Sequence, residues 1–277
     1  MEALCDHPDI RAVAFVGSTP IAKAVYARAT GTGKRALALG GAKNHFIVLP
    51  DADPDVTIDG VVRSFTGCAG QRCMAASLMI AVGDVDDLIH KIAAHAKTLE
   101  LGVDMGAIIE GSAWTRIQAD IEAAEQAGAK VIVDGRGATA PAGFESGHWL
   151  APTILDHATA DMQCATKELF GPVLTIVRVK TLDEALALQS GSPYGNAYSV
   201  FTTRGATARY VAERAEAAMV GINIGVPVPR EPFSFGGAKA SKFGSHDMTG
   251  WGGVDFWSSQ KKITSKWALH ADATWMS

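Results

Sequence analysis

Short apolar runs alternate along the chain with segments whose apolar side chains recur at helical spacing. Runs rich in β-branched residues predict buried strands, and recurrence at i, i+3 and i+4 predicts helices. The predicted strands are Ala12–Val16, Arg35–Leu39, Phe46–Leu49, Ser77–Val82, Lys130–Val133, Val173–Val179, Ala197–Phe201 and Val220–Ile224. The predicted helices are Ile21–Ala29, one starting at Pro54, Val85–Leu99, one capped by Ser112 and ending near Ala127, Leu182–Gln189 and Arg204–Ala217. This alternation predicts an α/β fold.

The helix that starts at Pro54 has the clearest boundaries. Asp53 can cap it, and proline suits the first turn of a helix. Its apolar positions recur on one face, at Ile58, Val61, Val62 and Phe65. Gly67 and Gly70 weaken the helix, so Cys73 is expected on a loop just past its end.

The last part of the chain has a strand-like pattern. Within Trp257–Trp267, the stretch Lys262–Lys266 alternates between charged or polar and less polar side chains, which predicts a terminal strand. An exposed edge strand needs a partner or protection from one. We therefore expect the chain to form a homo-oligomer.

Composition narrows the possible function classes. The chain has 277 residues, of which 48% are hydrophobic and 19% charged, as is usual for a globular protein. A formal net charge of −4 gives no reason to expect nucleic acid, and no apolar run approaches membrane-spanning length. The first residues lack the features of a signal peptide, so a cytoplasmic protein is expected. The eight histidines lack metal-ligand spacing, so no metal site is expected.

Four cysteines without a CxxC pair indicate reduced thiols. Cys5, Cys68 and Cys164 are interpreted as structural. Cys73 is a candidate nucleophile because it is placed on a loop next to a helix, although most free cysteines are small buried hydrophobes. The negative end of the preceding helix opposes thiolate formation. Activation must therefore come from positive charge, such as Arg72 or a cationic cofactor.

Two other segments carry candidate binding residues. Gly17 and Ser18 lie between a predicted strand and a predicted helix, an arrangement that points backbone N–H groups at a phosphate. A plain connection between strands has the same pattern. Glu168 ends a polar stretch just before a buried strand, where a solvated charge is the simple interpretation.

The segment Gly70-Gln71-Arg72-Cys73 resembles the active-site segment of the aldehyde dehydrogenase superfamily. With Met74-Ala75 it is most similar to the methylmalonate-semialdehyde dehydrogenase branch. The resemblance implies that Cys73 is the catalytic nucleophile, that NAD is the cofactor and that an aldehyde is the substrate. It extends to the turns Pro193–Asn196 and Pro232–Gly237.

The same resemblance implies a set of NAD-binding residues. In the family, a Phe-x-Gly-Ser-Thr segment lies beside the pyrophosphate, and Gly17 and Ser18 match its Gly-Ser pair. Gly40 belongs to a matching glycine motif. Glu168 matches a glutamate that bonds the nicotinamide ribose, and Phe170 matches an aromatic residue that packs near the nicotinamide. A carboxylate can accept hydrogen bonds from both ribose hydroxyls.

One departure from the family pattern is informative. Most members carry Glu-Leu-Gly-Gly-Lys, and alignment on Lys43 places Leu39 where that glutamate activates water. The methylmalonate-semialdehyde branch also lacks the glutamate and passes the acyl group to coenzyme A. A thiol needs less help than water to attack a thioester, because more of it is ionised near neutral pH. Arg72 is interpreted either as a ligand of the substrate carboxylate or as half of a surface ion pair.

The resemblance covers only the second half of the family. It implies that residues 1–40 are the trailing part of a Rossmann-type NAD-binding domain, 41–250 the catalytic domain and 251–277 an oligomerisation strand and tail. The matching half lacks several family residues that bind NAD and the oxyanion, so three functions stay open. They are coenzyme A-acylating oxidation of a methylmalonate or malonate semialdehyde, hydrolytic NAD-dependent aldehyde oxidation, and a non-catalytic, truncated relative acting as a folded or oligomer-forming domain.

Overall fold

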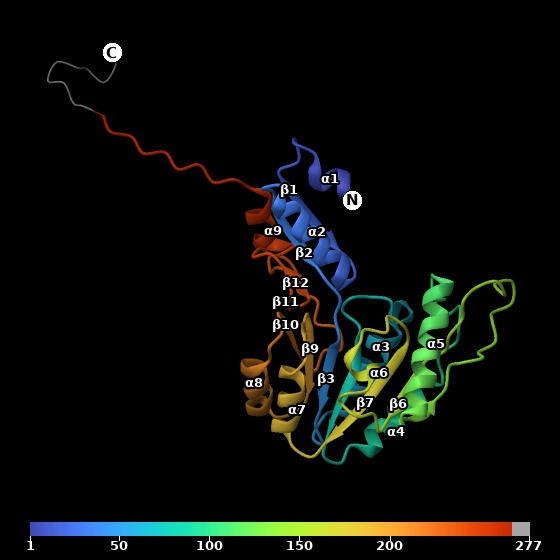
Figure 1. Ribbon diagram of the computed structural model, residues 1–277. Helices are drawn as coiled ribbons and strands as arrows, with labels where there is room; N and C mark the ends of the chain where they lie inside the picture. The colour runs from blue at the N-terminus through green and yellow to red at the C-terminus, as the bar shows by residue number, and fades with distance from the viewer. Residues whose placement is uncertain (268–277) are drawn as a thin grey trace.

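The computed structural model describes residues 1–267, which form two main sheets with helices against them and a short two-stranded sheet (Figure 1). The helices are α1 (Glu2–Asp6), α2 (Thr19–Gly31), α3 (Pro54–Thr66), the 3-10 turn η1 (Gly67–Gly70), α4 (Asp86–Ala96), α5 (Gly111–Gln126), α6 (Gln163–Thr166), α7 (Leu182–Ser190), α8 (Gly205–Arg214) and α9 (Gly250–Trp257). The strands are β1 (Ala12–Val16), β2 (Arg35–Leu39), β3 (Asn44–Val48), β4 (Ala76–Val82), β5 (Lys130–Val133), β6 (Thr153–Asp156), β7 (Val173–Val179), β8 (Tyr194–Gly195), β9 (Ala197–Phe201), β10 (Met219–Ile222), β11 (Ala238–Lys239) and β12 (Lys242–Phe243). Helices and strands alternate, which confirms the predicted α/β class.

The larger sheet has seven strands in the order β10-β9-β3-β4-β7-β6-β5. Every pair in it is parallel except β5 with β6. The strands β3 and β9 are buried along their whole length, and most of their residues are apolar.

Helices cover both faces of this sheet. On one face, Val61 and Phe65 of α3 and Ile92 of α4 pack against Met79 and Ala81 of β4. The alternate β4 residues, among them Leu78 and Ile80, face the other side, where the covering helices are α5, α7 and α8. The two faces therefore follow the period of two that a strand imposes.

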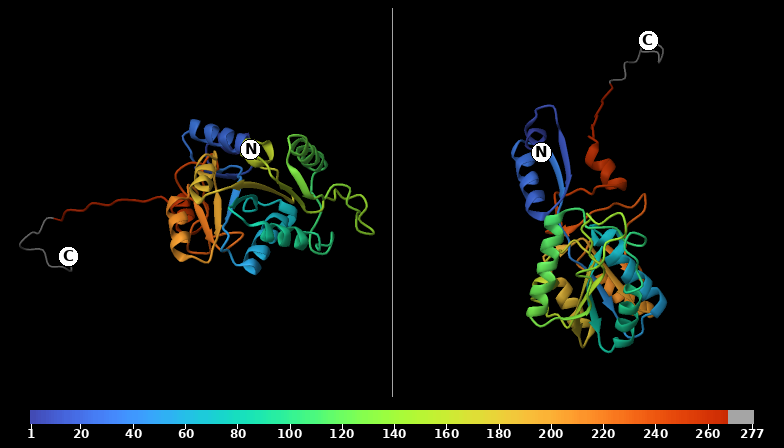
Figure 2. Two further views of the ribbon diagram at one scale, coloured as in Figure 1. Left: turned by 90° about the horizontal axis from the view of Figure 1, so that it is seen from below. Right: turned by 90° about the vertical axis from the view of Figure 1, so that its right-hand side faces the viewer.

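The smaller sheet has three strands in the order β1-β2-β12. β1 pairs in parallel with β2, and β12 returns from much later in the chain to pair antiparallel with it. Figures 1 and 2 show this sheet, with α1, α2 and α9, as a narrow lobe that extends from one end of the larger sheet. The predicted boundary at residue 40 falls between β2 and β3, but β12 and α9 also belong to the narrow lobe.

Several strand predictions are confirmed with the same bounds, including Ala12–Val16 and Val173–Val179. The interpretation of Ala12–Val16 as a buried strand is wrong, because Val13 is its one buried residue and Val16 is 56% exposed. Ser112 is not a cap, since α5 starts at Gly111 after an N-cap at Glu110. The strand Thr153–Asp156 has no counterpart among the predicted elements.

The predicted terminal strand is not formed in this chain. Trp257 ends α9, and residues 258–267 follow without strand pairing. Ile263 and Trp267 are 79% and 86% exposed. A lone terminal segment cannot complete a ladder by itself, since its backbone groups need a neighbouring strand. The rest of the predicted tail, residues 268–277, lies outside the described residues.

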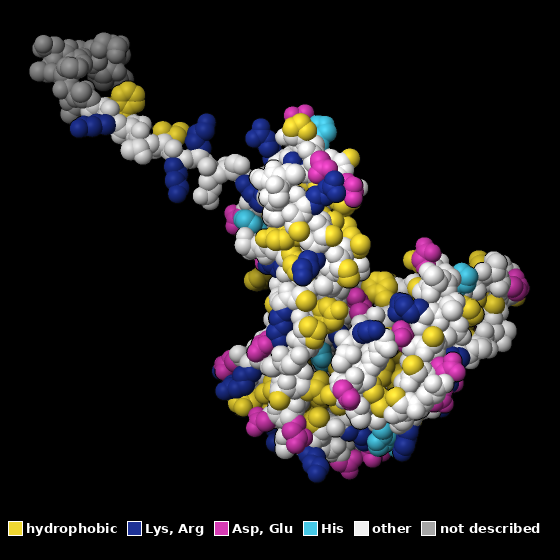
Figure 3. Space-filling model, in the orientation of Figure 1, with side chains coloured by type: hydrophobic (Ala, Val, Ile, Leu, Met, Phe, Trp, Pro, Cys, Tyr) yellow, Lys and Arg dark blue, Asp and Glu magenta, His cyan; other side chains and the backbone are white. Residues whose placement is uncertain are grey.

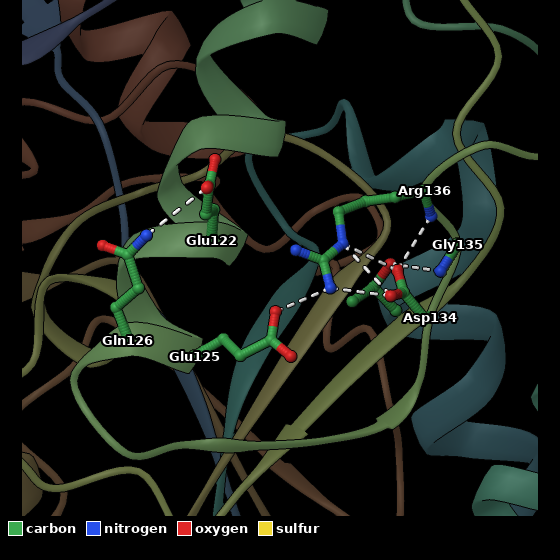
Figure 4. A network of polar contacts seen from close by, with 7 residues as sticks. Glu122, Glu125, Gln126, Asp134, Gly135 and Arg136 are labelled. Carbon is green, nitrogen blue, oxygen red and sulfur yellow. Dashed lines mark hydrogen bonds and ion pairs between the residues drawn. The ribbon is translucent and has the colours of Figure 1, made fainter.

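Charges of both signs are mixed over the face shown in Figure 3, without a large patch of one sign. One ion-pair network fastens the long connection after β5 to the end of α5 (Figure 4). There the guanidinium of Arg136 binds Asp134 at 2.7 Å and Glu125 at 2.8 Å. Within residues 1–267, no helix is both long and apolar enough to cross a membrane.

Candidate active site

Cys73 lies on the loop between η1 and β4, as the sequence predicts. Asp53 caps α3 by accepting a 3.0 Å hydrogen bond from the Val56 N–H. After α3 the chain turns sharply, with Cys68 and Ala69 at positive φ. Gly70 also has a positive φ and approaches the Gly171 carbonyl so closely that a side chain there would clash with it. The glycine therefore allows the cysteine loop to pack against the loop that carries Glu168 and Phe170.

The thiol of Cys73 is half-buried, so it is neither fully exposed nor sealed in the core. Burial raises its pKa, and the nearby Glu168 carboxylate raises it further. The backbone N–H groups of Cys73 and Met74 and the Arg72 guanidinium lower it, but by less. This chain's own groups therefore favour the thiol over the thiolate. Cys5 and Cys164 are buried, as structural cysteines usually are, whereas Cys68 is exposed.

Two buried asparagines hold the backbone of Cys73. Nδ2 of Asn44, on β3, donates to the Cys73 carbonyl at 2.8 Å, and Nδ2 of Asn196 donates to the same oxygen at 2.9 Å. Asn44 also donates to Ala75 at 3.0 Å and accepts the Ala197 N–H at 3.0 Å. The loop is thereby fastened to both β3 and β9.

Arg72 does not form the surface ion pair that was one of its two interpretations. Its guanidinium donates to the carbonyls of Arg63 and Ser64 at the end of α3, and no ion pair to it occurs among the described residues. It also lines a cavity of about 830 Å³ together with Arg63, Gly67 and Val226. A cationic side chain therefore lies in the wall of this cavity, next to Cys73 in the sequence, although Cys73 itself does not line the cavity.

Glu168 is not a solvated charge. Its carboxylate accepts the Ala42 N–H, and burial raises its pKa while Lys43 and Arg116 lower it. One carboxylate oxygen lies only 2.6 Å from where a side chain on Gly41 would begin, so a side chain there would displace the carboxylate. Phe170 follows with a positive φ of 59°, an uncommon conformation for a bulky residue, and its ring is 42% exposed. Strained backbone of this kind gathers at functional sites.

Gly17, Ser18 and Gly40 meet at the start of α2. Ser18 is the N-cap residue, although its side chain makes no capping bond. Gly40 packs against Thr19 and the Ala240 carbonyl with no room for a side chain. The Thr19 hydroxyl accepts the Gly41 N–H at 2.9 Å. The N-terminus of α2 thus lies beside the short loop that contacts Glu168 through Gly41. Free N–H groups at a helix N-terminus attract anions.

Leu39 is 4% exposed and packs in an apolar cluster with Leu37 and Phe256. The position that carries a glutamate in most of the resembled family is therefore an apolar core position in this chain. No side chain there can take a proton.

Two buried basic residues, Lys43 and His45, follow the loop that starts at Gly40. The Nζ of Lys43 is buried without a hydrogen-bond partner among the described residues, and burial lowers its pKa to about 8. His45 is also buried, and burial with the nearby Lys43 charge lowers its pKa to about 3. His45 is therefore neutral at physiological pH.

Sequence reasoning assigned no role to Thr19, Lys43, Asn44 or Asn196. Thr19 completes the Gly-Ser-Thr match, which was a usable signal. Asn196 ends the matching turn Pro193–Asn196 and Asn44 follows Lys43, but their contact joins residues 152 apart in the chain, which no local pattern reveals. Across residues 1–267 no group of three or more His, Cys, Asp or Glu side chains could hold a metal ion.

Comparisons with known proteins bear on this arrangement. A family model described as the aldehyde dehydrogenase family matches residues 1–263. Malonate-semialdehyde dehydrogenase 2 of Geobacillus kaustophilus is 41% identical over 96% of this chain and 56% of that relative. The human methylmalonate-semialdehyde/malonate-semialdehyde dehydrogenase [acylating] is 39% identical over 98% of this chain and 51% of its own length.

Solved structures of similar proteins have the same fold as this chain. A crystal structure described as a methylmalonate-semialdehyde dehydrogenase of Sinorhizobium meliloti, complexed with NAD, superposes with a TM-score of 0.95. It is 41% identical, over 98% of this chain and 57% of that one. The enzyme from Oceanimonas doudoroffii gives a TM-score of 0.94 at 41% identity, over 97% of this chain and 57% of that one. The chain spans just over half the length of these relatives, as the predicted match to one half of the family requires, and it belongs to the aldehyde dehydrogenase family.

Proposed function

We propose that this chain carries the catalytic half of an NAD-dependent enzyme that oxidises a malonate- or methylmalonate-semialdehyde-type aldehyde to an acyl-coenzyme A. The observation that carries the proposal is the half-buried Cys73 beside Glu168, on a loop fixed by two asparagines. The named relatives act on this class of semialdehyde, and each is about twice as long as this chain.

The reaction uses the sulfur of Cys73 twice. Its thiolate adds to the aldehyde carbon, which gives a thiohemiacetal on Cys73. Loss of a hydride from that carbon leaves a thioester. The sulfur of coenzyme A then attacks the thioester carbonyl, and the Cys73 thiolate leaves. For a semialdehyde of this class the substrate carboxylate departs as carbon dioxide, and a proton takes its place on the carbon.

The residues at the start of α2 fit NAD. Gly17, Ser18 and Gly40 would lie along the pyrophosphate, where glycine removes side-chain bulk and the helix end attracts negative charge. Glu168 would accept from the ribose hydroxyls, and the exposed ring of Phe170 would pack near the nicotinamide. When bound, NAD would supply the hydride acceptor and a positive charge near the thiol.

Coenzyme A is favoured over water as the acyl acceptor because Leu39 is apolar and buried. Water needs a base to attack a thioester at neutral pH, whereas a thiol is already partly ionised. Arg72 would bind the substrate carboxylate, since it lines the large cavity and meets no carboxylate among the described residues. Rotating towards the substrate would cost it the bonds to Arg63 and Ser64.

Two alternatives remain open. A hydrolytic aldehyde dehydrogenase would need a base other than Leu39, and the raised pKa of Glu168 makes that carboxylate the nearest candidate. A non-catalytic role as a folded or oligomer-forming domain is favoured by the match to only about half of each relative. We further propose a homo-oligomer, because apolar side chains such as Trp251 and Ile263 are exposed.

NADH formation from malonate semialdehyde, with and without coenzyme A, tests the proposal. The expected result is NADH formation that requires coenzyme A and is abolished in Cys73→Ala. Equal rates without coenzyme A would support hydrolysis instead. Absence of turnover, together with no NAD binding in a titration of the isolated chain, would support the non-catalytic alternative.

A further inference from the structure

The carbonyl of Cys73 receives an unusual pair of hydrogen bonds. Asn44 and Asn196 approach it from different strands, at 2.8 Å and 2.9 Å, and both side chains are buried. Two amide donors on one carbonyl exceed what is needed to satisfy it, because one bond is enough to avoid the cost of an unpaired group. The arrangement therefore indicates that the two asparagines do more than satisfy the hydrogen-bonding capacity of this carbonyl.

The asparagines also brace each other. Asn196 Nδ2 lies 3.5 Å from Asn44 Oδ1 and 3.4 Å from the sulfur of Met74, and the Ala197 N–H donates to Asn44 Oδ1 at 3.0 Å. Neither side chain can rotate without breaking several of these bonds. A pair fixed in this way holds its target in one orientation.

The held carbonyl belongs to the same planar peptide unit as the N–H of Met74. Fixing the oxygen therefore fixes the direction of that N–H, whose interaction with the thiol lowers the pKa of Cys73. We propose that Asn44 and Asn196 are positioning residues, which orient the Cys73–Met74 peptide so that its N–H is presented to the nucleophilic sulfur. The inference rests on the proposed role of Cys73 as nucleophile.

The consequence is a division of roles around the thiol. Burial and Glu168 oppose the thiolate, and the peptide N–H groups support it. If the peptide could rotate, the N–H would be lost and the opposing effects would remain. The asparagines themselves touch no reacting atom, so they act only through the backbone of Cys73.

The test measures the reactivity of the thiol itself and needs neither NAD nor coenzyme A. The rate of Cys73 alkylation by iodoacetamide is followed from pH 6 to pH 10 by peptide mass spectrometry, in a Cys68→Ser background because Cys68 is exposed. Asn196→Ala should shift the reactivity midpoint to higher pH. Below the midpoint it should slow alkylation roughly threefold to tenfold, as the loss of one net hydrogen bond implies.

Asn196→Leu is the second variant, since it keeps the side-chain volume and removes the donor. Gln189→Ala is the matched control, because it removes another buried amide, in α7, that accepts a hydrogen bond from the Glu216 N–H away from Cys73. The control should leave the midpoint unchanged. A folded Asn196 variant with an unshifted midpoint would overturn the proposal, and so would failure of both variants to fold, since the amide would then serve the fold alone.

The two proposals fail in different ways. A shifted midpoint without any turnover would leave the positioning role standing and reject the enzymatic function of this chain. Turnover with an unshifted midpoint would do the reverse.

Discussion

The two lobes of this molecule differ in the size of their buried cores. In the larger lobe, helices cover both faces of a seven-stranded sheet, and its central strands β3 and β9 are buried throughout. The narrow lobe consists of a three-stranded sheet with the helices α1, α2 and α9, and Val16 of β1 is exposed. The nucleophile lies on the first, and most of the residues that fit NAD lie on or next to the second.

The nucleophile and the cofactor site therefore depend on lobes with different packing. A nucleophile must be held within a fraction of an ångström, which needs a rigid surrounding core. The larger lobe provides that rigidity through its packed strands. The narrow lobe has two smaller apolar clusters, one around Val13, Val25 and Ala36 and one of Leu37, Leu39 and Phe256. We therefore expect this chain to keep an ordered thiol site even where its cofactor site binds weakly.

The largest expected effect comes from cutting into the main core. Phe46 is fully buried on β3 and stacks edge-on with Phe201 at 5.7 Å. Phe46→Ala should lower the free energy of unfolding by about 3–5 kcal/mol, measured by urea denaturation. Val13→Ala, in the narrow lobe, should cost only about 1–2 kcal/mol. Equal losses would contradict the contrast between the lobes.

A second variant tests the buried charge beside the site. Burial lowers the pKa of Lys43 to about 8 in the folded chain, from 10.5. The unfolded chain therefore holds the proton more tightly, so wild-type stability should rise between pH 8 and pH 10.5. Lys43→Met should add about 3 kcal/mol of stability below pH 8.

That gain should be nearly gone by pH 10.5, because the folded lysine is then neutral and the unfolded lysine has lost half of its protons. Denaturation at pH 7, 8.5 and 10 measures it. Lys130→Met replaces an exposed lysine of β5 and is the matched control. A gain that does not change with pH would show that improved packing, rather than a removed charge, is its cause.

A third variant tests the contact between the cofactor-binding residues and the nucleophile. The Glu168 carboxylate raises the pKa of the Cys73 thiol. Glu168→Gln should therefore speed alkylation of Cys73 at mildly alkaline pH by about twofold to fivefold, the effect of removing one nearby charge in a partly solvated site. It should also weaken NAD binding in a titration. Slower alkylation in this variant would mean that the carboxylate assists the thiol.

The smallest effect is expected far from the site. Arg136 binds Asp134 and Glu125 on the surface (Figure 4). Arg136→Ala should change the free energy of unfolding by about 1 kcal/mol or less, as exposed ion pairs do. Thermal unfolding measures it. A loss comparable with that of Phe46→Ala would mean that the loop after β5 supports the core.

Much of the fold was predictable because its signals are local. The strands Arg35–Leu39 and Ala197–Phe201 are short and mostly apolar, and both are confirmed. The cap at Asp53 is likewise local and is confirmed. The two-residue strand Lys242–Phe243 was not predictable, because it exists only through pairing with Leu39 and Ala38 of β2.

The site was predictable in part. Cys73, Glu168 and Gly40 carry motif signals that a single sequence preserves. The burial of Lys43 and the meeting of Asn44 with Asn196 depend on how distant strands are arranged, which periodicity does not encode. For the terminal segment the prediction was wrong for a different reason. Its sequence alternates as a strand does, but no partner strand pairs with it within residues 1–267.

The most direct test of the central claim is to look for the acyl group on Cys73. The chain is incubated with NAD and malonate semialdehyde without coenzyme A, quenched in acid and analysed by peptide mass spectrometry. The account predicts an acyl thioester on the Cys73 peptide, which coenzyme A then removes as acyl-coenzyme A. An unmodified Cys73 in a sample that has formed NADH, or an adduct that coenzyme A does not release, would contradict it.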